Sequence, residues 1–254
     1  MKITVLGCGT SGGVPLIGND WGACDPNDPR NRRTRVSILV EQGGTSLLVD
    51  TSPDMRQQLL DCNLKDLTAV IYTHTHADHT HGIDDIRSLN WLTQRPMDIY
   101  ADAETMEELK VKFSYIFEGN KKPGEFYKPG IIEHIIDGPF NVGAISVQPF
   151  VQNHGHGQSL GLRFGDFAYS TDVHELDEVA FNMLKGIKVW VVDCVREKPH
   201  PTHSHLEQTL QWIARVKPER AYLTHMNNTL DYAKLLAKLP SGVWPAHDGL
   251  VIEC

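Results

Sequence analysis

The sequence predicts an α/β (α+β) fold in which two β-sheets pack face to face and helices cover their outer faces. Strand-like apolar runs and helical segments alternate along the 254 residues, and the second half repeats the style of the first. No low-complexity stretch interrupts the alternation, so no domain boundary is indicated. We therefore expect residues 1–254 to form a single domain, which a chain of this length can fill with one large core.

The first half of the chain is expected to begin with a strand. Gly43-Gly44 supplies a hairpin turn between two later strands, and Ser52-Pro53 precedes a helix. Residues 118–130, which contain glycines, prolines and several lysines, are the best candidate for a mobile insertion or lid. Strands are expected at 2–7, 36–41, 46–50 and 67–73, and helices at 82–94 and 102–114.

The second half continues with strands that lead to two further helices. Residues 206–216 are expected to be helical, and Ser204 with Glu207 fits a capping box that places the start of this helix at Ser204. Asp248-Gly249 marks the turn before the last strand. Strands are expected at 131–136, 144–150, 160–164, 167–171, 187–193, 220–224 and 250–253, and additional helices at 176–185 and 229–239.

Composition favours a soluble cytoplasmic enzyme. The formal net charge of -8 argues against a surface that coats nucleic acid, so no stable nucleic-acid partner is expected. No apolar segment approaches the ~18–20 residues needed to span a bilayer, and the N-terminus reads as a strand and not a signal peptide. The cysteines are odd in number and scattered, which is typical of free thiols in a reducing compartment: Cys8, Cys24, Cys62, Cys194 and Cys254.

Four metal-competent side chains follow the strand predicted at 67–73. The segment reads His74-x-His76-x-Asp78-His79. Side chains two apart on an extended chain point the same way, so His74 and His76 can close on one metal ion. The chain must then turn, which aims Asp78 and His79 at a second position nearby. A polar loop of solvated histidines is the alternative, and this spacing argues against it.

Further ligands are expected from strand ends in the second half. His154, Asp172 and His225 each follow an apolar run, where a sheet places residues in a cleft at its edge. Taken singly, each would be a turn or capping residue. Taken with the first motif, they complete two sites for divalent ions, with room left for water. One site would use His74, His76 and His154, the other Asp78, His79 and His225, and Asp172 would bridge them.

This pattern resembles the metallo-β-lactamase superfamily of dinuclear metallohydrolases over nearly the whole chain. The resemblance implies a four-layer αββα sandwich of two mixed sheets. It also implies that Asp50, which ends the run Leu47-Leu48-Val49, supports the metal site from behind the ligands, although the same residue also fits a helix cap. The segment from Leu6 to Pro15 is similar to the branch that contains the cyclic-phosphate phosphodiesterase of bacterial phosphonate breakdown.

A nucleotide-binding loop is the alternative interpretation of that N-terminal segment. Gly7, Gly9 and Gly12 form G-x-G-x-x-G after a strand, which in a dinucleotide fold opens a helix. Here no helical periodicity follows, and the chain stays loop-like through Pro29. The sequence therefore argues against this interpretation.

His203 is the candidate catalytic residue beside the metals. The segment 201–206 is similar to the phosphodiesterase branch, where a histidine just before this helix acts at the scissile phosphate. His203 would be a general acid toward the leaving alkoxide or a positively charged donor to phosphate oxygens. A histidine exposed beside a helix cap is the alternative. We expect His205 to be structural, and we assign no role to His200 or His156.

One family feature is missing from this chain. The phosphodiesterase relative has a separate structural zinc, held by three cysteines and a histidine, but Asn19, Trp21 and Asn228 stand at three of those positions and only Cys24 remains. One thiolate cannot hold a structural zinc, so no such site is expected. The arginines of the following segment are expected to anchor the 14–33 loop and less to bind a substrate phosphate: Arg32, Arg33 and Arg35.

The sequence thus predicts a dinuclear metal-dependent hydrolase, most simply a phosphodiesterase for small cyclic or nucleotide-like phosphodiesters. His203 and Asp172 are its catalytic candidates. Imidazole and carboxylate ligands admit Zn²⁺, Mn²⁺ or Fe²⁺. A thioester or lactone hydrolase of the glyoxalase II type is the alternative, because the fold does not separate these chemistries. A homodimer is compatible with the sequence, which does not determine the oligomeric state or the natural substrate.

Overall fold

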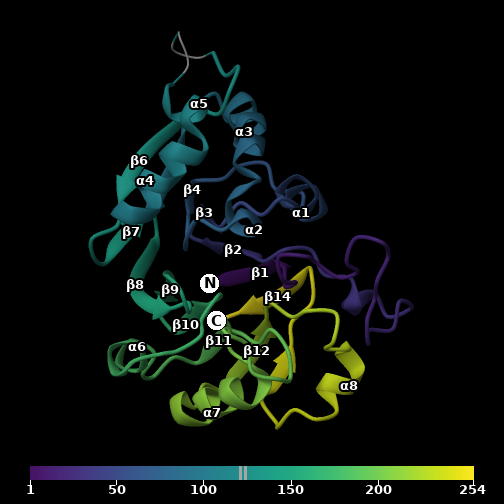
Figure 1. Ribbon diagram of the computed structural model, residues 1–254. Helices are drawn as coiled ribbons and strands as arrows, with labels where there is room; N and C mark the ends of the chain where they lie inside the picture. The colour runs from purple at the N-terminus through teal and green to yellow at the C-terminus, as the bar shows by residue number, and fades with distance from the viewer. Residues whose placement is uncertain (120–121, 123–124) are drawn as a thin grey trace.

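Two mixed sheets form the centre of the molecule, as the sequence predicted (Figure 1). The structure, a computed structural model, describes residues 1–119, 122 and 125–254. Within these residues the first sheet has the order β14 (Leu250–Glu253), β1 (Lys2–Gly7), β2 (Ser37–Gln42), β3 (Thr45–Val49), β4 (Ala69–Ile71), β5 (Met97–Ala101) and β6 (Ile131–Ile135). The second has the order β13 (Val243–Pro245), β12 (Arg220–Thr224), β11 (Val189–Asp193), β10 (Phe167–Ser170), β9 (Gln158–Phe164), β8 (Ile145–Asn153) and β7 (Phe140–Val142).

Both sheets follow the same plan. In the first, the pairs from β14 to β3 are antiparallel and those from β3 to β6 are parallel. In the second, the pairs from β7 to β10 are antiparallel and those from β10 to β13 are parallel. Parallel neighbours end at the same edge of a sheet, so the residues that follow β3, β4, β10, β11 and β12 are brought to the carboxyl edges, where α/β proteins place their sites.

Helices cover the outer faces of both sheets, which gives the predicted four layers (Figure 1). Over the first sheet lie α1 (Met55–Asp61), α2 (Ala77–Thr80), α3 (Ile86–Thr93), α4 (Ala103–Lys112) and α5 (Ser114–Phe117). Over the second lie α6 (Glu178–Met183), α7 (Leu206–Val216) and α8 (Tyr232–Leu236). Two short 3-10 turns, η1 (Pro29–Asn31) and η2 (Ile83–Asp85), complete the described elements.

The core separates into two clusters because neighbouring strand residues point to opposite faces. Leu47 and Val49 belong to the cluster between the sheets, which continues under α6 to α8. Leu48, between them in sequence, belongs to the cluster under α1, α3 and α4. Strand β1 is buried from Ile3 onward, since both of its faces are covered.

Several element boundaries differ from the sequence prediction. The helix expected at 82–94 begins as η2 and becomes α3, and the one expected at 229–239 contains only α8 as regular α-helix. Asp231 starts α8 by accepting the backbone N–H of Lys234. Strands β7 and β13, of three residues each, were not predicted, because runs so short show no periodicity.

The capping box predicted at Ser204 is wrong. The residue at the N-cap of α7 is His205, and its side chain makes no capping hydrogen bond. The Ser204 hydroxyl instead donates to the carbonyl oxygen of Asp193 at 2.6 Å, while its backbone N–H donates to the Asp193 carboxylate at 3.3 Å. Ser204 therefore hydrogen-bonds to the buried Asp193 at the end of β11 and does not cap α7.

The segment predicted as an insertion or lid lies partly outside the described residues, at positions 120, 121, 123 and 124. Its later part contacts α3: the indole N–H of Trp91 donates to the carbonyl oxygen of Phe126, and Arg87 donates to that of Tyr127. None of the helices in the described part of the chain has the length and apolarity that crossing a bilayer requires.

Candidate metal centre

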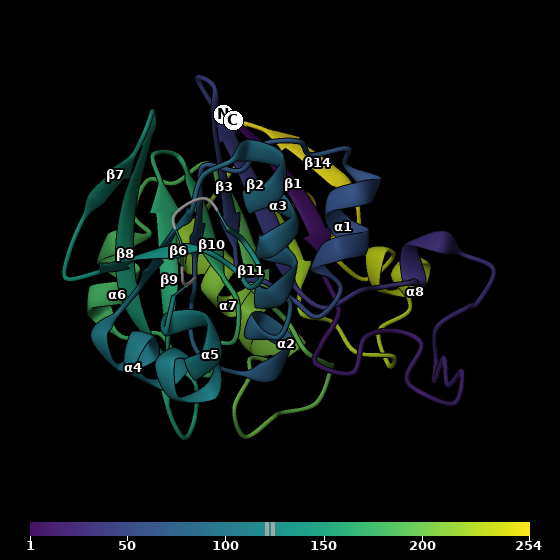
Figure 2. The same ribbon diagram turned by 90° about the horizontal axis from the view of Figure 1, so that it is seen from above.

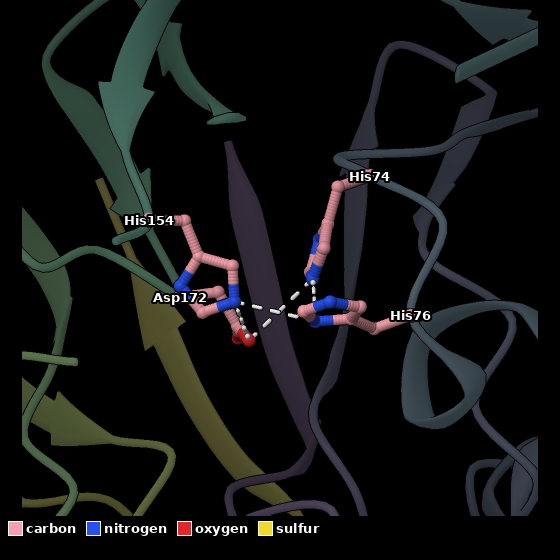
Figure 3. A group of neighbouring side chains, drawn as sticks. All are labelled: His74, His76, His154 and Asp172. Carbon is pink, nitrogen blue, oxygen red and sulfur yellow. Dashed lines mark hydrogen bonds and ion pairs between the residues drawn. The ribbon is translucent and has the colours of Figure 1, made fainter. Parts of the chain in front are cut away.

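The predicted ligands converge in two groups at the carboxyl edges of the sheets. The first ligand group consists of His74, His76, His154 and Asp172, and Figure 3 shows these side chains directed toward a common point. His76 Nδ1 lies 3.0 Å from His74 Nε2 and 3.2 Å from His154 Nε2. The Asp172 Oδ2 atom is 3.5 Å from His74 Nε2 and 3.4 Å from His154 Nε2.

The second ligand group consists of Asp78, His79, His225 and again Asp172. The other carboxylate oxygen of Asp172, Oδ1, lies 3.1 Å from His79 Nε2 and 3.4 Å from His225 Nε2. Asp78 Oδ2 lies 3.6 Å and 3.5 Å from the same two nitrogens. Each oxygen of Asp172 therefore faces one group, which is the arrangement expected of a bridging carboxylate.

The longer of these separations, 3.4–3.6 Å between carboxylate oxygens and imidazole nitrogens, suit ligands that share a divalent ion. Ligand atoms about 2.0–2.2 Å from a tetrahedral ion lie about 3.3–3.6 Å apart, close to the distances within both groups. The Nε2 atoms of His79 and His225 are buried and have no hydrogen-bond partner in the described structure. A buried polar atom without a partner is costly, and a cation between these nitrogens and the carboxylates would satisfy them.

The protonation states in the first ligand group also suit metal binding. Burial lowers the pKa of His154 to about 3, and burial followed by the neighbouring His74 lowers the pKa of His76. Both imidazoles are therefore neutral, which is the form that binds metals. In the second group burial would lower the pKa of His79, but Asp172, Asp78 and Asp50 outweigh it and raise that pKa well above its usual value. The same excess of carboxylate charge attracts cations.

Three residues at strand ends, the ligands Asp172 and His225 and the nearby Asp50, have a strained backbone conformation. Asp50, Asp172 and His225 have positive φ angles of 63°, 49° and 57°, a conformation that side chains other than glycine rarely adopt. Each follows a strand of a parallel pair and turns its side chain inward. Strain of this kind persists where the surrounding structure imposes it and is typical of functional sites.

Asp50 contacts His79 of the second ligand group on the ring nitrogen that faces away from the other ligands. Its carboxylate accepts the backbone N–H and the hydroxyl of Thr73, each at 2.8 Å, and lies 2.7 Å from His79 Nδ1. A partner on Nδ1 leaves Nε2 of the same ring free for a metal. Of the two roles considered for Asp50, these contacts fit the supporting one; the residue at the N-cap of α1 is Asp54.

His203 lies beside both ligand groups and is held by Asp193. Its Nδ1 is 3.1 Å from Asp193 Oδ2, its Nε2 is 3.9 Å from Asp172 Oδ2, and its ring stacks on His225 with centroids 4.6 Å apart. Burial would lower the pKa of His203, but the carboxylates of Asp193 and Asp172 outweigh it and raise the pKa to about 9. The Asp193 carboxylate thus favours the protonated, donating form of the imidazole.

Asp193 is the site residue that the sequence interpretation missed. It is fully buried, and its Oδ2 also accepts the backbone N–H groups of Val173 and Ser204. It ends the run Val191-Val192-Asp193 just as Asp50 ends Leu48-Val49-Asp50. That repeated pattern, an apolar strand closed by aspartate, was the available signal.

The glycine-rich N-terminal segment packs closely against the chain and contacts the residue that follows His225. Gly7 passes so close to the carbonyl oxygen of Arg35 that an added Cβ would lie 2.1 Å from it. Farther along, the Cys8 carbonyl accepts the backbone N–H of Met226, the residue after His225. No helix occurs between Gly12 and η1, which agrees with rejecting a dinucleotide-binding loop.

The arginines anchor the N-terminal loop, as expected. Arg33, only 1% exposed, donates to the carbonyl oxygens of Asn227 at 3.0 Å and Leu230 at 2.6 Å. Arg35 pairs with Asp54 at 3.0 Å, and Arg32 lies over the Trp21 ring. Figure 2 shows this loop beside α8.

Comparison with known proteins places this geometry in a family. The family described as "Beta-lactamase superfamily domain" matches residues 45–226, which contain every member of both ligand groups. The chain belongs to this superfamily. Superfamily membership and the His/Asp groups together indicate a metallohydrolase fold that binds divalent metal.

Three relatives cover nearly the whole chain. A crystal structure titled as a new diphosphatase from the PhnP family is 36% identical, with a TM-score of 0.91 over 100% of this chain and 97% of that one. An octanoyltransferase of Porphyromonas gingivalis is 32% identical over 98% of this chain, but the chain spans only 51% of that protein. Zn²⁺-bound PqqB from Methylobacterium extorquens is 19% identical, with a TM-score of 0.77 and full coverage of both chains, and shows the shared fold.

Proposed function

We propose that the protein hydrolyses small phosphodiesters, cyclic or nucleotide-like, with the help of two divalent ions, Zn²⁺ or Mn²⁺. His74, His76 and His154 would hold one ion and Asp78, His79 and His225 the other, with Asp172 shared. When bound, such ions supply the positive charge that neutralises a phosphodiester and the Lewis acidity that activates water.

The observation that carries this proposal is the Asp193–His203 pair beside the shared carboxylate. With Nδ1 on Asp193, His203 directs Nε2 toward Asp172, 3.9 Å away. A cationic imidazole in this position can donate its Nε2 proton to a departing alkoxide or a hydrogen bond to a phosphate oxygen. Both contributions suit phosphodiester hydrolysis, in which the leaving oxygen gains negative charge.

The comparison with the PhnP-family diphosphatase supports cleavage of a phosphorus–oxygen bond, because 36% identity extends over the whole chain. The alternative is hydrolysis of a thioester or lactone on the same ions. One observation favours it: the octanoyltransferase relative is named for acyl chemistry. Since this chain matches about half of that protein, its named activity need not reside in the matched half.

A substrate panel separates the two proposals. The protein, loaded with Mn²⁺ or Zn²⁺, would be assayed on bis-p-nitrophenyl phosphate, a 2′,3′-cyclic nucleotide, S-lactoylglutathione and nitrocefin. We expect turnover of the phosphodiesters to exceed that of the other two substrates. Faster turnover of S-lactoylglutathione would favour the thioesterase instead. The expectations of a single domain, a cytoplasmic location and a homodimer stay predictions.

A further inference from the structure

A groove leads away from the first ligand group along α4 and the turn between β8 and β9. Its inner part, with a volume of about 460 Å³, is lined by His74, His76 and His154 together with residues of α4. Its outer part, about 660 Å³, ends near Asp177 before α6. The two parts form one continuous groove because they share four wall residues: Glu104, His156, Gly157 and Gln158.

The wall of this groove carries negative charge that no cation neutralises. Lys112 is the one lysine or arginine among its described lining residues, and it is paired with Glu108 at 3.4 Å. Among the described residues no lysine or arginine forms an ion pair with the remaining carboxylates, which come from α4, the residue before it and the segment before α6: Asp102, Glu104, Glu175 and Asp177.

The other side of the candidate centre is formed by His203 and the loop before it. His203 is not part of the groove wall, and its ring stacks on His225 of the second ligand group. The loop before His203 carries His200, whose ring centroid lies 5.0 Å from that of His203. It also carries Lys198 and Arg196, and the Arg196 guanidinium donates to the carbonyl oxygens of Lys198 and Pro199. The acidic groove and the His203 loop thus lie on different sides of the centre.

We propose that the groove receives the part of the substrate that remains on the phosphate after cleavage, and that it selects a neutral hydroxyl-bearing or a cationic group there. This proposal rests on the proposed function for the position of the phosphate at the ligand groups. A second phosphate in the groove would meet the four carboxylates, so the groove disfavours an additional anionic group. An asymmetric substrate is therefore bound with its less anionic part in the groove.

Equilibrium binding tests the groove without requiring turnover. Calorimetry on the metal-loaded protein would compare three phosphomonoesters that differ in their tails: phosphorylcholine, thymidine 5′-phosphate and thymidine 3′,5′-bisphosphate. We expect the bisphosphate to bind about tenfold more weakly than thymidine 5′-phosphate at low salt. The reason is that the groove carboxylates, which have no lysine or arginine partner, repel its second phosphate. The difference should shrink as salt screens the groove.

A pair of charge-matched variants localises the effect. Glu104→Gln/Glu175→Gln should bring the affinities of the bisphosphate and thymidine 5′-phosphate to within about threefold and weaken the binding of phosphorylcholine. Glu207→Gln/Glu219→Gln removes the same formal charge from exposed positions outside the groove and should preserve the wild-type ranking. Equal or tighter binding of the bisphosphate by the wild type would overturn the proposal, as would equal changes in both variants.

Turnover separates this proposal from the proposed function. If the binding ranking holds and responds to the groove variant while no phosphodiester is hydrolysed, the groove is retained and the phosphodiesterase proposal fails. If phosphodiesters are hydrolysed but the ranking is absent, the groove proposal fails and the phosphodiesterase proposal is retained.

Discussion

Asp172 is the residue on which a two-ion centre depends, because its two oxygens face different ligand groups. Replacing it with alanine removes the negative charge between two cations that repel each other. We expect Asp172→Ala to lose metal as well as activity, measured by elemental analysis of the dialysed protein and by phosphodiester turnover.

Asp172→Asn is the matched control, since it keeps the shape and removes the charge. It should lie between the wild type and the alanine variant in metal content. Two retained ions and normal turnover in Asp172→Ala would show that the bridging assignment is wrong.

His203 makes a different prediction, because it faces the centre without belonging to either ligand group. His203→Ala should retain metal and fold but slow phosphodiester hydrolysis by about 10²–10⁴-fold for alkyl or ribosyl leaving groups. The loss should shrink for p-nitrophenyl esters, whose leaving group needs little protonation. Steady-state rates across leaving groups measure this. Equal losses would indicate phosphate binding, and no loss would make His203 structural.

Asp193 is predicted to act through His203. Asp193→Asn removes the carboxylate that raises the pKa of His203, so the ring is less often protonated on both nitrogens and Nε2 becomes a weaker acid. We expect turnover to fall by about 10²-fold with the same dependence on leaving group, while metal content changes little. A uniform loss for all leaving groups, or a protein that no longer folds by circular dichroism, would contradict a positioning role.

At the scale of elements, the N-terminal loop is held to the segment after His225 by one buried cation. Arg33→Ala would leave the carbonyl oxygens of Asn227 and Leu230 without donors and open a cavity. The free energy of unfolding should fall by about 3 kcal/mol, as measured by urea denaturation of the metal-loaded protein. Arg32→Ala, at an exposed position one residue away, should change it by less than about 1 kcal/mol.

The elements also differ in how well the sequence predicted them. The strands that carry His74, Asp172 and His225 were predicted because an apolar run closed by a polar ligand is a local pattern. The start of α7 was not, because Ser204 satisfies a distant acceptor at Asp193, and no spacing within the helix reveals that contact. The strand-end pattern could have flagged Asp193, but not its role, because its partners His203 and Val173 are 10 and 20 residues away in sequence.

At the scale of the whole molecule, the candidate centre joins the two sheets. His74, His76, Asp78 and His79 follow β4 of the first sheet, whereas His154, Asp172 and His225 follow strands of the second. Bound ions would therefore stabilise the packing of sheet on sheet. The four-layer arrangement was predictable from alternating apolar runs and the family resemblance. That each sheet has an antiparallel half and a parallel half could not be predicted, because it depends on which strands pair, and the sequence alone does not show this.

Because the ligands come from both sheets, we expect the stability of the protein to depend on bound metal. Removing the ions with a chelator should lower the melting temperature, and restoring them at about 100 times their dissociation constant should recover about 2.7 kcal/mol per site. Differential scanning calorimetry across a Zn²⁺ or Mn²⁺ titration measures this. Asp172→Ala should show a much smaller shift; an equal shift in both proteins would place the stabilising ion elsewhere.

The position of β14 has a consequence for synthesis. It pairs with β1, and the backbone N–H of Cys254 donates to the carbonyl oxygen of Met1. During translation β1 therefore waits with one edge open until residues 250–253 have emerged from the ribosome. The last ligand, His225, is made shortly before them. Metal capture and closure of the first sheet thus both wait until nearly all of these elements have been made, and the nascent chain must keep an exposed strand edge from pairing with other chains until then.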